Sequence, residues 1–340
     1  MKRMSRKLSV RVPVILAALG LVLAAALVVA QSSNATTRGK NGRIVYATEV
    51  AGHFQLFTIA PDGTDVKQLT HFAGGSDAVN PDWSPDGKRI AFDREFPYPH
   101  AGVYTIDADG GDVKAVTPDT KLLFDGNPAY SPDGKIVVAA REVHHDENTI
   151  TTRDYGVIVA ERLDGTGVRE VSPRIHLTVN DVPHLEDPNF SPDGTWVTFI
   201  RINEEHALQA LFRMHPDGTA LRRLTPYSWE VAIKHDWSPD GKLIVLTTNA
   251  DFAKPTESAN LVVIRPDGSG AKQLTHFKAG RRNAFAGSFS PDGKQIVFRL
   301  EQGDTYALAV IGRDGKHMRL LTKLSPTKPR FIDWGPKPQP

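Results

Sequence analysis

Residues 83–92 read WSPDGKRIAF, and variants of this stretch recur along the chain. The tetrapeptide Ser-Pro-Asp-Gly occurs five times, and an aromatic residue precedes every copy. In this tetrapeptide proline presets φ for the first corner of a turn, aspartate hydrogen-bonds its own backbone, and glycine takes the left-handed position. Such recurrence indicates a repeat protein whose units share one tight turn. The aromatic residues are Trp83, Tyr130, Phe190, Trp237 and Phe289, and a degenerate sixth copy is Trp334-Gly335-Pro336.

A second turn signal, Asp-Gly, alternates with the first. Each of its copies follows a short run of β-forming residues and precedes a run that ends in Leu-Thr or a close variant. The runs between the two kinds of turn alternate or stay apolar, as half-buried strands do. Each repeat should therefore hold four antiparallel strands: A before SPDG, B after it, C before Asp-Gly and D after it. The six pairs are Asp62-Gly63, Asp109-Gly110, Asp164-Gly165, Asp217-Gly218, Asp267-Gly268 and Asp314-Gly315.

The first B, C and D strands, which begin near Arg43, have no A strand before them. The last A strand, Phe331–Trp334, has no strand after it. A ring in which this last strand completes the first sheet hides edges that an open array would expose. We therefore predict an all-β, six-bladed β-propeller of four-stranded antiparallel blades, closed by three N-terminal strands plus one C-terminal strand. The propeller is expected over residues 41–336, after a linker at 31–40 and before a tail at 337–340.

The first 30 residues have the composition of an export signal. Five cations and no acid precede an apolar run from Val12 to Ala30, and polar residues follow. Small residues at 28–30, or at 33–35, suit a signal peptidase. The apolar run is also about 19 residues long, enough to span a bilayer as a retained anchor. Either way, residues 41–340 are predicted to be exported: periplasmic, on the cell surface or secreted.

Composition excludes several classes of function. The chain has no cysteine, which rules out disulfides, thiolate metal sites and a thiol nucleophile. The overall charge of +2 becomes −3 once the five N-terminal cations are set aside, so the folded part does not attract nucleic acid. No Gly-x-Ser-x-Gly, His-Glu-x-x-His or phosphate-binding glycine loop is present. No catalytic residue is therefore nominated.

The aromatic-SPDG-Lys-x-Ile-x-Phe run and the Asp-Gly…Leu-Thr run resemble the propeller repeats of the TolB family over residues 41–336. The resemblance implies a six-bladed propeller in the cell envelope. TolB itself carries an α/β domain before its propeller, and this sequence shows no counterpart, so a role in a Tol complex is not carried over. Some TolB-like propellers resemble oligogalacturonate lyases, which use a metal held by histidine at the channel mouth.

The alternation of the turns predicts where a site lies. The A–B and C–D turns fall on one face of the ring and are nearly constant, whereas the B–C and D–A loops fall on the other and vary. Repeats that vary on one face usually place recognition there. Polar residues just before the A strands should ring the channel mouth on that face. The predicted binding residues are Asn80, Asn127, His184, Glu186, Asp187, Lys234, His235, Arg281, Arg282 and Arg330.

These residues also allow a simpler interpretation, in which they solvate a water-filled channel or bond neighbouring blades. If they bind a ligand, the mixture of four cations with two acids favours a peptide or an anionic group. The third repeat adds histidines in its B–C loop, and a divalent metal there would need ligands from two loops. Otherwise that run is a solvated loop tip. The metal candidates are His144, His145, His184 and Glu186.

Together these observations give one main hypothesis and one alternative. The main hypothesis is a non-catalytic, extracytoplasmic binding or scaffold module for an envelope protein or peptide, without a cofactor and without a nucleic-acid partner. It would contact a membrane only through residues 12–30, if these stay uncleaved. The alternative is a metal-assisted polysaccharide lyase or hydrolase whose site, with a divalent metal as cofactor, lies at the channel mouth.

Overall fold

The structure, a computed structural model, describes residues 38–97, 100–118, 120–146, 151, 153–177, 185–203, 208–248 and 258–338. The chain divides into residues 1–31 and 32–340, and all described residues belong to the second unit. Regular structure in the described ranges consists of strands and one short 3-10 helix, Tyr227–Trp229. The export signal predicted at residues 1–30 lies outside these ranges. None of the helical structure in the described ranges is long and apolar enough to cross a bilayer.

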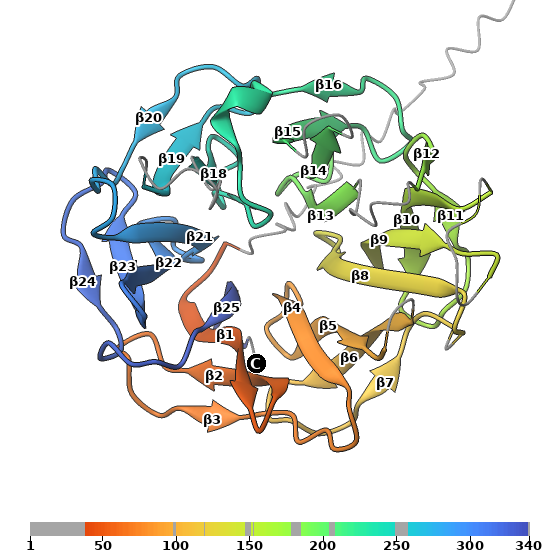
Figure 1. Ribbon diagram of the computed structural model, residues 1–340, viewed down its shortest axis with the longest axis horizontal. Coiled ribbons are helices and arrows are strands. Elements are labelled where there is room, and N and C mark those ends of the chain that lie inside the picture. The colour runs from red at the N-terminus through yellow and green to blue at the C-terminus, as the bar shows by residue number, and fades with distance from the viewer. Residues whose placement is uncertain are drawn as a thin grey trace, which may run out of the picture. The chain divides into compact units, whose positions relative to one another are not determined.

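The strands are arranged in antiparallel sheets around a common centre (Figure 1). Four of the sheets have four strands each. Their orders are β25(Arg330–Pro336)-β1(Asn41–Val50)-β2(His53–Ile59)-β3(Lys67–Gln68), β13(Leu185–Phe190)-β14(Val197–Asn203)-β15(Leu208–Met214)-β16(Arg222–Arg223), β17(Asp236–Trp237)-β18(Ile244–Thr248)-β19(Asn260–Ile264)-β20(Lys272–Gln273) and β21(Asn283–Phe289)-β22(Gln295–Gln302)-β23(Thr305–Gly312)-β24(Arg319–Leu320).

The other nine strands form a single sheet. Within it β6 and β8 run parallel and meet at one residue pair, Ala101 with Phe124. The order is β11(Arg169–Glu170)-β10(Tyr155–Arg162)-β9(Ile136–Val143)-β8(Leu123–Tyr130)-β6(Ala101–Asp107)-β5(Arg89–Glu95)-β4(Asp77–Trp83), with β7(Lys114–Ala115) paired to β6 and β12(Ile175–His176) paired to β10.

The propeller-like arrangement of four-stranded antiparallel sheets is confirmed, but the expectation of six separate sheets is wrong. The outer strand of every sheet is only two residues long, and β7 pairs only with Tyr104 and Thr105 of β6. The end of β6 at Ala101 therefore stays open, and an open strand edge readily pairs with another strand. β8 bonds it at Phe124, which joins two four-stranded groups into one sheet.

The two ends of the folded unit share one sheet, as the sequence predicted. β25 pairs antiparallel with β1, with Ile44 opposite Trp334 and Val45 opposite Asp333. The Trp334 indole N–H donates to the Gly42 carbonyl at 3.1 Å. Three N-terminal strands plus one C-terminal strand thus complete the sheet that closes the ring.

Hydrogen bonds inside the SPDG turn explain why serine recurs with proline, aspartate and glycine. In the first copy Gly87 has a φ of 69°, and its N–H donates to the Ser84 carbonyl at 2.9 Å. Ser84 Oγ donates to Asp86 Oδ1 at 2.7 Å and accepts the N–H of Arg89 at 2.9 Å. The same serine bonds recur at Ser131, Ser191, Ser238 and Ser290.

The glycines of the six Asp-Gly turns lock each repeat onto the one before it. All six have φ between 78° and 97°, which favours glycine. Each also lies against a backbone carbonyl near the end of strand D of the preceding repeat. An added Cβ would collide with that carbonyl at four of the six glycines and crowd it at Gly110 and Gly315. A Cβ on Gly268 would lie 2.5 Å from the Leu224 oxygen. The contacts join Gly63 to Leu321, Gly110 to Leu69, Gly165 to Val116, Gly218 to Val171, Gly268 to Leu224 and Gly315 to Leu274.

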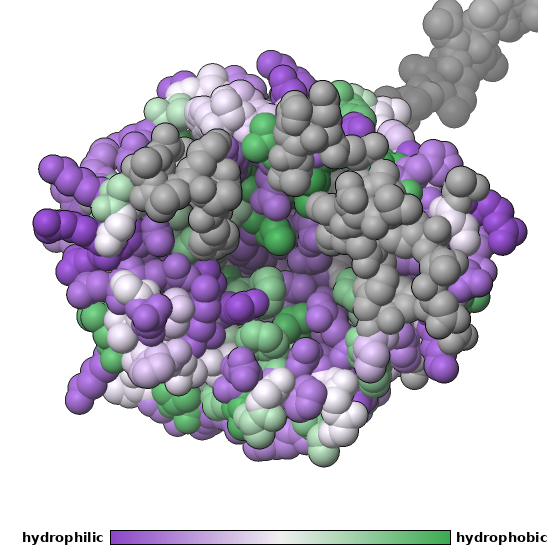
Figure 2. Space-filling view, viewed as in Figure 1, coloured by the Kyte–Doolittle hydropathy of each residue, from purple (hydrophilic) through white to green (hydrophobic). Residues whose placement is uncertain are grey.

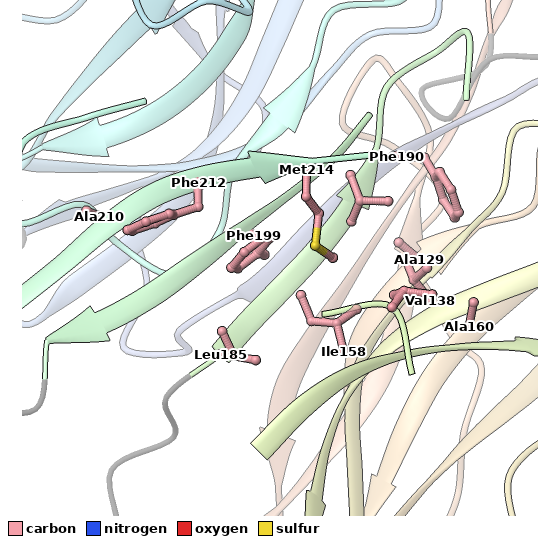
Figure 3. Packing of buried hydrophobic residues seen from close by; sticks show 12 residues of the cluster. Ala129, Val138, Ile158, Ala160, Leu185, Phe190, Phe199, Ala210, Phe212 and Met214 are labelled. Atoms are coloured by element: carbon pink, nitrogen blue, oxygen red, sulfur yellow. The ribbon is translucent and has the colours of Figure 1, made fainter. Parts of the chain in front are cut away.

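The core lies between neighbouring sheets, where side chains from two of them interdigitate. Figure 3 shows Phe199 and Met214 of one sheet beside Ile158 and Val138 of the next. The aromatic residues that precede SPDG, and Trp334, are at most 4% exposed, so they pack in this core.

The residue before each aromatic often caps the backbone of the following repeat. Tyr130 N–H, for example, donates to Asp82 Oδ2 at 2.8 Å. Because both groups are buried, this bond ties one inner strand to the next and satisfies a donor that water cannot reach. The other caps run from Trp83 to Asp333, from Phe289 to Asp236 and from Trp334 to Ser288.

Candidate functional site

Strand register fixes which loops share a face. Trp83 pairs with Ile90 and Arg89 pairs with Asp107, so the SPDG and Asp-Gly turns lie at the same end of these strands. We call this end the turn face. At the opposite end Glu95 pairs with both Asp77 and Ala101, and we call that end the mouth face. The centre of the ring is hollowed (Figure 2).

A β-bulge in the inner strands aims several predicted residues toward the centre. Asn80, Asn127 and Asp187 each lie three residues before the aromatic, and their φ values are 49°, 53° and 47°. The pairing register shifts at the same place in β4, β8 and β13. Asparagine and aspartate tolerate this left-handed conformation better than most residues, and bulges often re-aim side chains beside a site.

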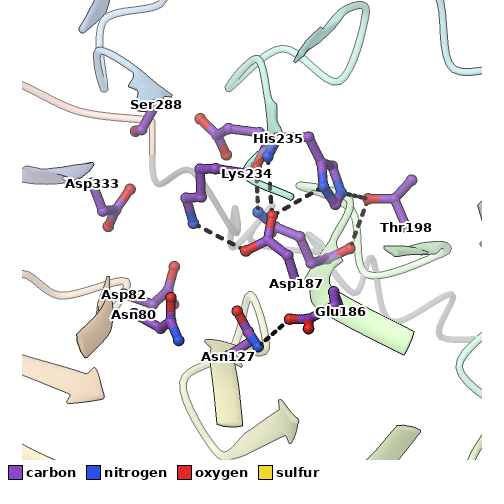
Figure 4. Close-up of polar contacts among 12 residues, drawn as sticks. Asn80, Asp82, Asn127, Glu186, Asp187, Thr198, Lys234, His235, Ser288 and Asp333 are labelled. Atoms are coloured by element: carbon purple, nitrogen blue, oxygen red, sulfur yellow. Dashed lines mark hydrogen bonds and ion pairs between the residues drawn. The ribbon is translucent and has the colours of Figure 1, made fainter. Parts of the chain in front are cut away.

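The two asparagines hold buried carboxyl groups in place. Asn80 Nδ2 donates to Asp93 Oδ2 at 2.9 Å. Asn127 Nδ2 donates to Glu186 Oε2 at 2.8 Å (Figure 4). Asp93 is fully buried and Glu186 is 8% exposed. The second bond links a residue of β8 to one of β13, so it also joins two sheets. Asn80, Asn127 and Glu186, all predicted from the sequence, thus take part in one network.

Four carboxyl groups on this side of the mouth face influence one another, and we call them the carboxyl cluster: Asp93, Glu95, Glu142 and Glu186. Burial, with the charge of Glu95, raises the pKa of Asp93 well above its usual value. Burial also raises the pKa of Glu186 to about 8, with Glu142 contributing. Glu186 is therefore protonated at neutral pH, and an approaching cation would favour its ionised form.

Asp187 has a different environment from its neighbour Glu186. Its Oδ1 lies 3.4 Å from Lys234 Nζ, and its Oδ2 accepts the His235 backbone N–H at 3.0 Å. His235 Nδ1 is also 3.0 Å from Oδ2 but off the line of a hydrogen bond, so this contact is electrostatic. His235 Nε2 lies 2.8 Å from Thr198 Oγ1. Burial opposes the charge of Asp187, but Lys234 and His235 outweigh burial and lower its pKa.

Lys234 is a counter-ion inside the ring rather than part of a cationic surface. Its side chain is 17% exposed and points among carboxylates from several inner strands (Figure 4). Burial acts to lower its pKa, but Asp187, Asp333 and Asp82 outweigh burial and raise it. Burial and Asp333 raise the pKa of Asp82, and Lys234 opposes that rise. Lys234 therefore balances aspartates that cap neighbouring repeats, which is the simpler interpretation offered above.

The other predicted cations lie together across the ring from β8 (Figure 1). Arg281 and Arg282 are exposed just before β21, and Arg330 opens β25. Arg282 Nε donates to Gln302 Oε1 at 3.0 Å.

Sequence reasoning missed two further cations beside these, Arg299 on β22 and Lys328 before β25. The sequence contained a signal for Arg299, because no other repeat has a cation at this position of strand B. The equivalent residues are Ala47, Asp93, Ala140, Ile200 and Thr247.

The two histidines of the third repeat turn toward Asp154. His145 Nδ1 lies 3.0 Å from Asp154 Oδ1, and His144 Nδ1 lies 3.6 Å from Oδ2. Asp154 also accepts the His145 N–H at 3.0 Å, the Thr151 hydroxyl at 2.6 Å and the Thr151 N–H at 3.0 Å. Its oxygens are therefore occupied by the loop itself.

The predicted metal ligands do not fit a metal site as far as the structure describes them. Glu186 bonds Asn127, whereas His145 bonds Asp154 and the Nε2 of His144 lies 3.3 Å from Glu142 Oε2. His184 lies outside the described residues. Within the described ranges, no three histidine, aspartate or glutamate side chains are placed to hold an ion. No catalytic step through a metal is derived for this chain.

The third repeat also buries a charged trio that the sequence analysis overlooked. Arg141 pairs with Asp125 through two bonds, Nε–Oδ1 at 2.6 Å and Nη2–Oδ2 at 2.8 Å. Its Nη2 also lies 3.4 Å from Glu161 Oε2. Glu161 is 2% exposed, and burial raises its pKa to about 7. The sequence contained a signal for Glu161, because every other repeat has an apolar residue at this position of strand C. The equivalent residues are Ile59, Ile106, Met214, Ile264 and Ile311.

Replacing Glu161 by glutamine should stabilise the protein at alkaline pH only. The folded-state pKa of Glu161, about 7, lies above the ordinary glutamate value of 4.5, so stability falls as pH rises from 4.5 to 7. At pH 8 we expect Glu161→Gln to raise the free energy of unfolding by about 1–3 kcal/mol, with little change at pH 4.5. Urea titrations at both pH values measure this, with exposed Glu49→Gln as the control. An equal gain at both would exclude ionisation as the cause.

The turn face is not as uniform as its sequence suggested. A pocket of about 600 Å³ lies there between the sheets β13–β16 and β17–β20, and its lining includes Trp196, Asp193 and Asp240. The Trp196 ring stacks on His215 at 4.0 Å, and the Arg213 guanidinium lies 4.0 Å from its centre. Tryptophan at this position was the missed signal, since the equivalent residues are Arg89, Ile136, Leu243 and Gln295.

No family model matches the chain. In sequence, the chain is 31% identical over 150 residues to a protein named uncharacterized peptidase YuxL from Bacillus subtilis (strain 168). The match covers 35% of this chain and 22% of the relative, so this chain spans about a fifth of that protein's length.

Among solved structures, the folded unit is similar to known β-propellers. TolB from Acinetobacter baumannii matches with a TM-score of 0.65 at 21% identity, over 87% of this chain and 67% of that chain. An oligogalacturonate lyase in complex with manganese matches with a TM-score of 0.56 at 14% identity, over 84% of this chain and 76% of that chain. At these identities the likeness concerns the fold alone. The chain has a TolB-like β-propeller fold, as the repeat signature predicted.

Proposed function

We propose that this chain is an exported binding module that takes an envelope protein or peptide at its channel mouth and catalyses no reaction. The observation that carries the proposal is the chemical contrast across the mouth face. The carboxyl cluster lies on one side, and Arg281, Arg282 and Arg330 lie on the other. A peptide can offer both a basic and an acidic group, and complementary charges favour specific association.

The architecture and location that we propose rest on two further observations. The nine-stranded sheet counts as two blades, β4–β7 and β8–β11, because only Ala101 and Phe124 join them, and this gives six blades. The glycine contact that recurs six times around the ring supports this count. Residues 1–30 act as a signal peptide or anchor, with a linker at 31–40, the propeller at 41–336 and a tail at 337–340.

Site-directed photocrosslinking in cells tests the proposal. Benzoylphenylalanine in place of Arg282 or Glu95, on the mouth face, is expected to form an adduct with a partner in the envelope fraction. The same substitution at Lys135, exposed on the turn face, is the matched control and should form none. N-terminal sequencing of the exported protein reports whether residues 1–30 are removed. Equal adducts at all three positions, or a protein that stays in the cytoplasm, would contradict the proposal.

A second candidate is a metal-assisted polysaccharide lyase or hydrolase, because a manganese-bound oligogalacturonate lyase shares the fold, although the described histidines form no metal site. A lyase would release unsaturated uronides from oligogalacturonate when manganese or calcium is added, and the absorbance of the new double bond measures this. If such turnover is observed and is lost when the metal is chelated, the protein is an enzyme and the proposal of a non-catalytic binding module is wrong. Absence of turnover and of bound metal in elemental analysis removes the support for this candidate.

A further inference from the structure

Three cations from β22, from β25 and from the loop before β25 meet on the mouth face, and we call them the basic cluster: Arg299, Lys328 and Arg330. Lys328 Nζ lies 2.9 Å and Arg299 Nε lies 3.0 Å from the same oxygen, Oε1 of Glu301. Burial is the main reason why the pKa of Arg299 is lowered to about 10; Glu301 opposes this, and the charge of Arg330 adds to it. The cluster therefore carries positive charge that its nearest carboxylate does not balance.

Aromatic rings hold the three cations in fixed positions. The Arg299 guanidinium lies 4.3 Å from the centre of the Phe285 ring, and that of Arg330 lies 5.0 Å from the Phe54 ring. Lys328 Nζ lies 4.9 Å from the centre of the Tyr306 ring. A guanidinium stacked in this way keeps the N–H groups of its edge for a ligand, and little further entropy is lost when it binds.

Arg299 lies at the buried base of the cluster. Its Nη1 donates to the Pro329 carbonyl at 3.3 Å. Its Nε is buried and faces Glu301 Oε1 at 3.0 Å without hydrogen-bond geometry, so Lys328 and Arg330 present the more accessible charges of the cluster. Beside the cluster, exposed Arg281 and Arg282 add two more cations. Figure 2 shows that the surface over β21 and β25, next to the central hollow, is hydrophilic.

We infer that the basic cluster binds the carboxylate groups of an acidic peptide segment, with Arg281 and Arg282 at the rim of the same site. The inference rests on the proposed function and specifies its ligand. Guanidinium groups match carboxylates through paired N–H donors, and ammonium groups add a point charge. A peptide is favoured over a polyuronate because a peptide can also present a basic group to the carboxyl cluster, whereas a polyuronate carries acids only.

Selection from a random decapeptide library displayed on phage tests the inference with the full-length protein. Among peptides retained at low salt, we expect aspartate and glutamate to be enriched at least about threefold, and at least tenfold weaker binding at 0.5 M salt. The variant Lys328→Gln/Arg330→Gln should lose the enrichment. The matched control Lys88→Gln/Lys135→Gln removes two exposed cations from the turn face and should keep it.

The outcomes separate this inference from the proposed function. Peptides selected without acidic enrichment, or an enrichment that survives Lys328→Gln/Arg330→Gln, would overturn the inference and leave the binding module standing. No selected peptide, together with no adduct at the mouth face, would overturn both. Displacement of bound peptide by tri-galacturonate but not by tri-glutamate would assign the cluster to uronates instead. The three cations of the basic cluster repel one another, so Lys328→Gln/Arg330→Gln should not lower the melting temperature. If it does, the selection is repeated with Arg281→Gln/Arg282→Gln, which changes exposed cations at the rim of the same site.

Discussion

Replacing Lys234 by methionine is expected to lower the free energy of unfolding by about 3–5 kcal/mol at pH 7.5. The ammonium group lies 3.4 Å from Asp187 and is surrounded by Asp82 and Asp333, which come from other inner strands. Methionine fills a similar volume, so the change removes the charge and leaves buried carboxylates without their counter-ion. Each of them must then stay charged without compensation or take up a proton, and either costs free energy.

The pH dependence of the Lys234→Met defect identifies its cause. Without the cation, the pKa of Asp82, which burial already raises, rises further in the folded state, and the pKa of Asp187 loses the lowering effect of Lys234. An acid with a raised folded pKa loses stability as pH rises, so the defect should shrink toward pH 4.5. Urea unfolding at pH 4.5 and pH 7.5 measures this, and Lys294→Met, at a side chain that is 81% exposed, is the control. A defect of the same size at both values would instead indicate lost packing.

Replacing Gly268 by alanine is expected to cost about 3 kcal/mol of stability, from left-handed backbone strain and a steric collision. Gly268 has a φ of 86°, and an added Cβ would lie 2.5 Å from the Leu224 carbonyl oxygen of the preceding sheet. That oxygen belongs to backbone and cannot move without disturbing the contact between repeats. Thermal and urea unfolding of the purified variant measure the loss.

A second glycine separates the collision from the backbone strain. Gly241, in an SPDG turn, has a φ of 66° and no atom within 4 Å of an added Cβ. Gly241→Ala should therefore cost only the strain, about 1 kcal/mol. If both variants lose the same stability, the packing of Asp-Gly turns on the preceding repeat does not contribute.

The repeats and the closure of the ring could be predicted from the sequence because both depend on short turn motifs. SPDG and Asp-Gly fix tight turns through their own backbone bonds, as Gly87 and Ser84 show, and counting the strands between them leaves one strand missing at each end. The bond between Ala101 and Phe124 could not be predicted in this way. The outer strand is equally short in every repeat, and no turn signal marks the one place where β8 bonds the open edge of its neighbour β6.

The candidate site could be predicted where the position of a residue within the repeat determines its place. It could not be predicted where contacts between different sheets determine the role of a residue. Asn80, Asn127 and Asp187 each lie three residues before the aromatic residue of an inner strand, and the repeat spacing was enough to predict that they occupy equivalent positions. The role of Lys234 depends on carboxylates that come from several sheets, which no linear spacing reveals. Arg299 lay within reach of the sequence, because comparing equivalent positions among the six repeats shows a cation where the others have none.

Because β1 and β25 share a sheet, the same fold could form from a chain that begins and ends at a different turn. The Lys337 N–H donates to the Lys40 carbonyl at 2.8 Å, so a short loop could join these ends and the polypeptide could be opened at any turn between strands instead. A circular permutant opened at Gly52, where an added Cβ meets no atom within 4 Å, should reach the same wheel. Its strand partners would be unchanged, although the pairing that now spans nearly the entire chain would become a local hairpin.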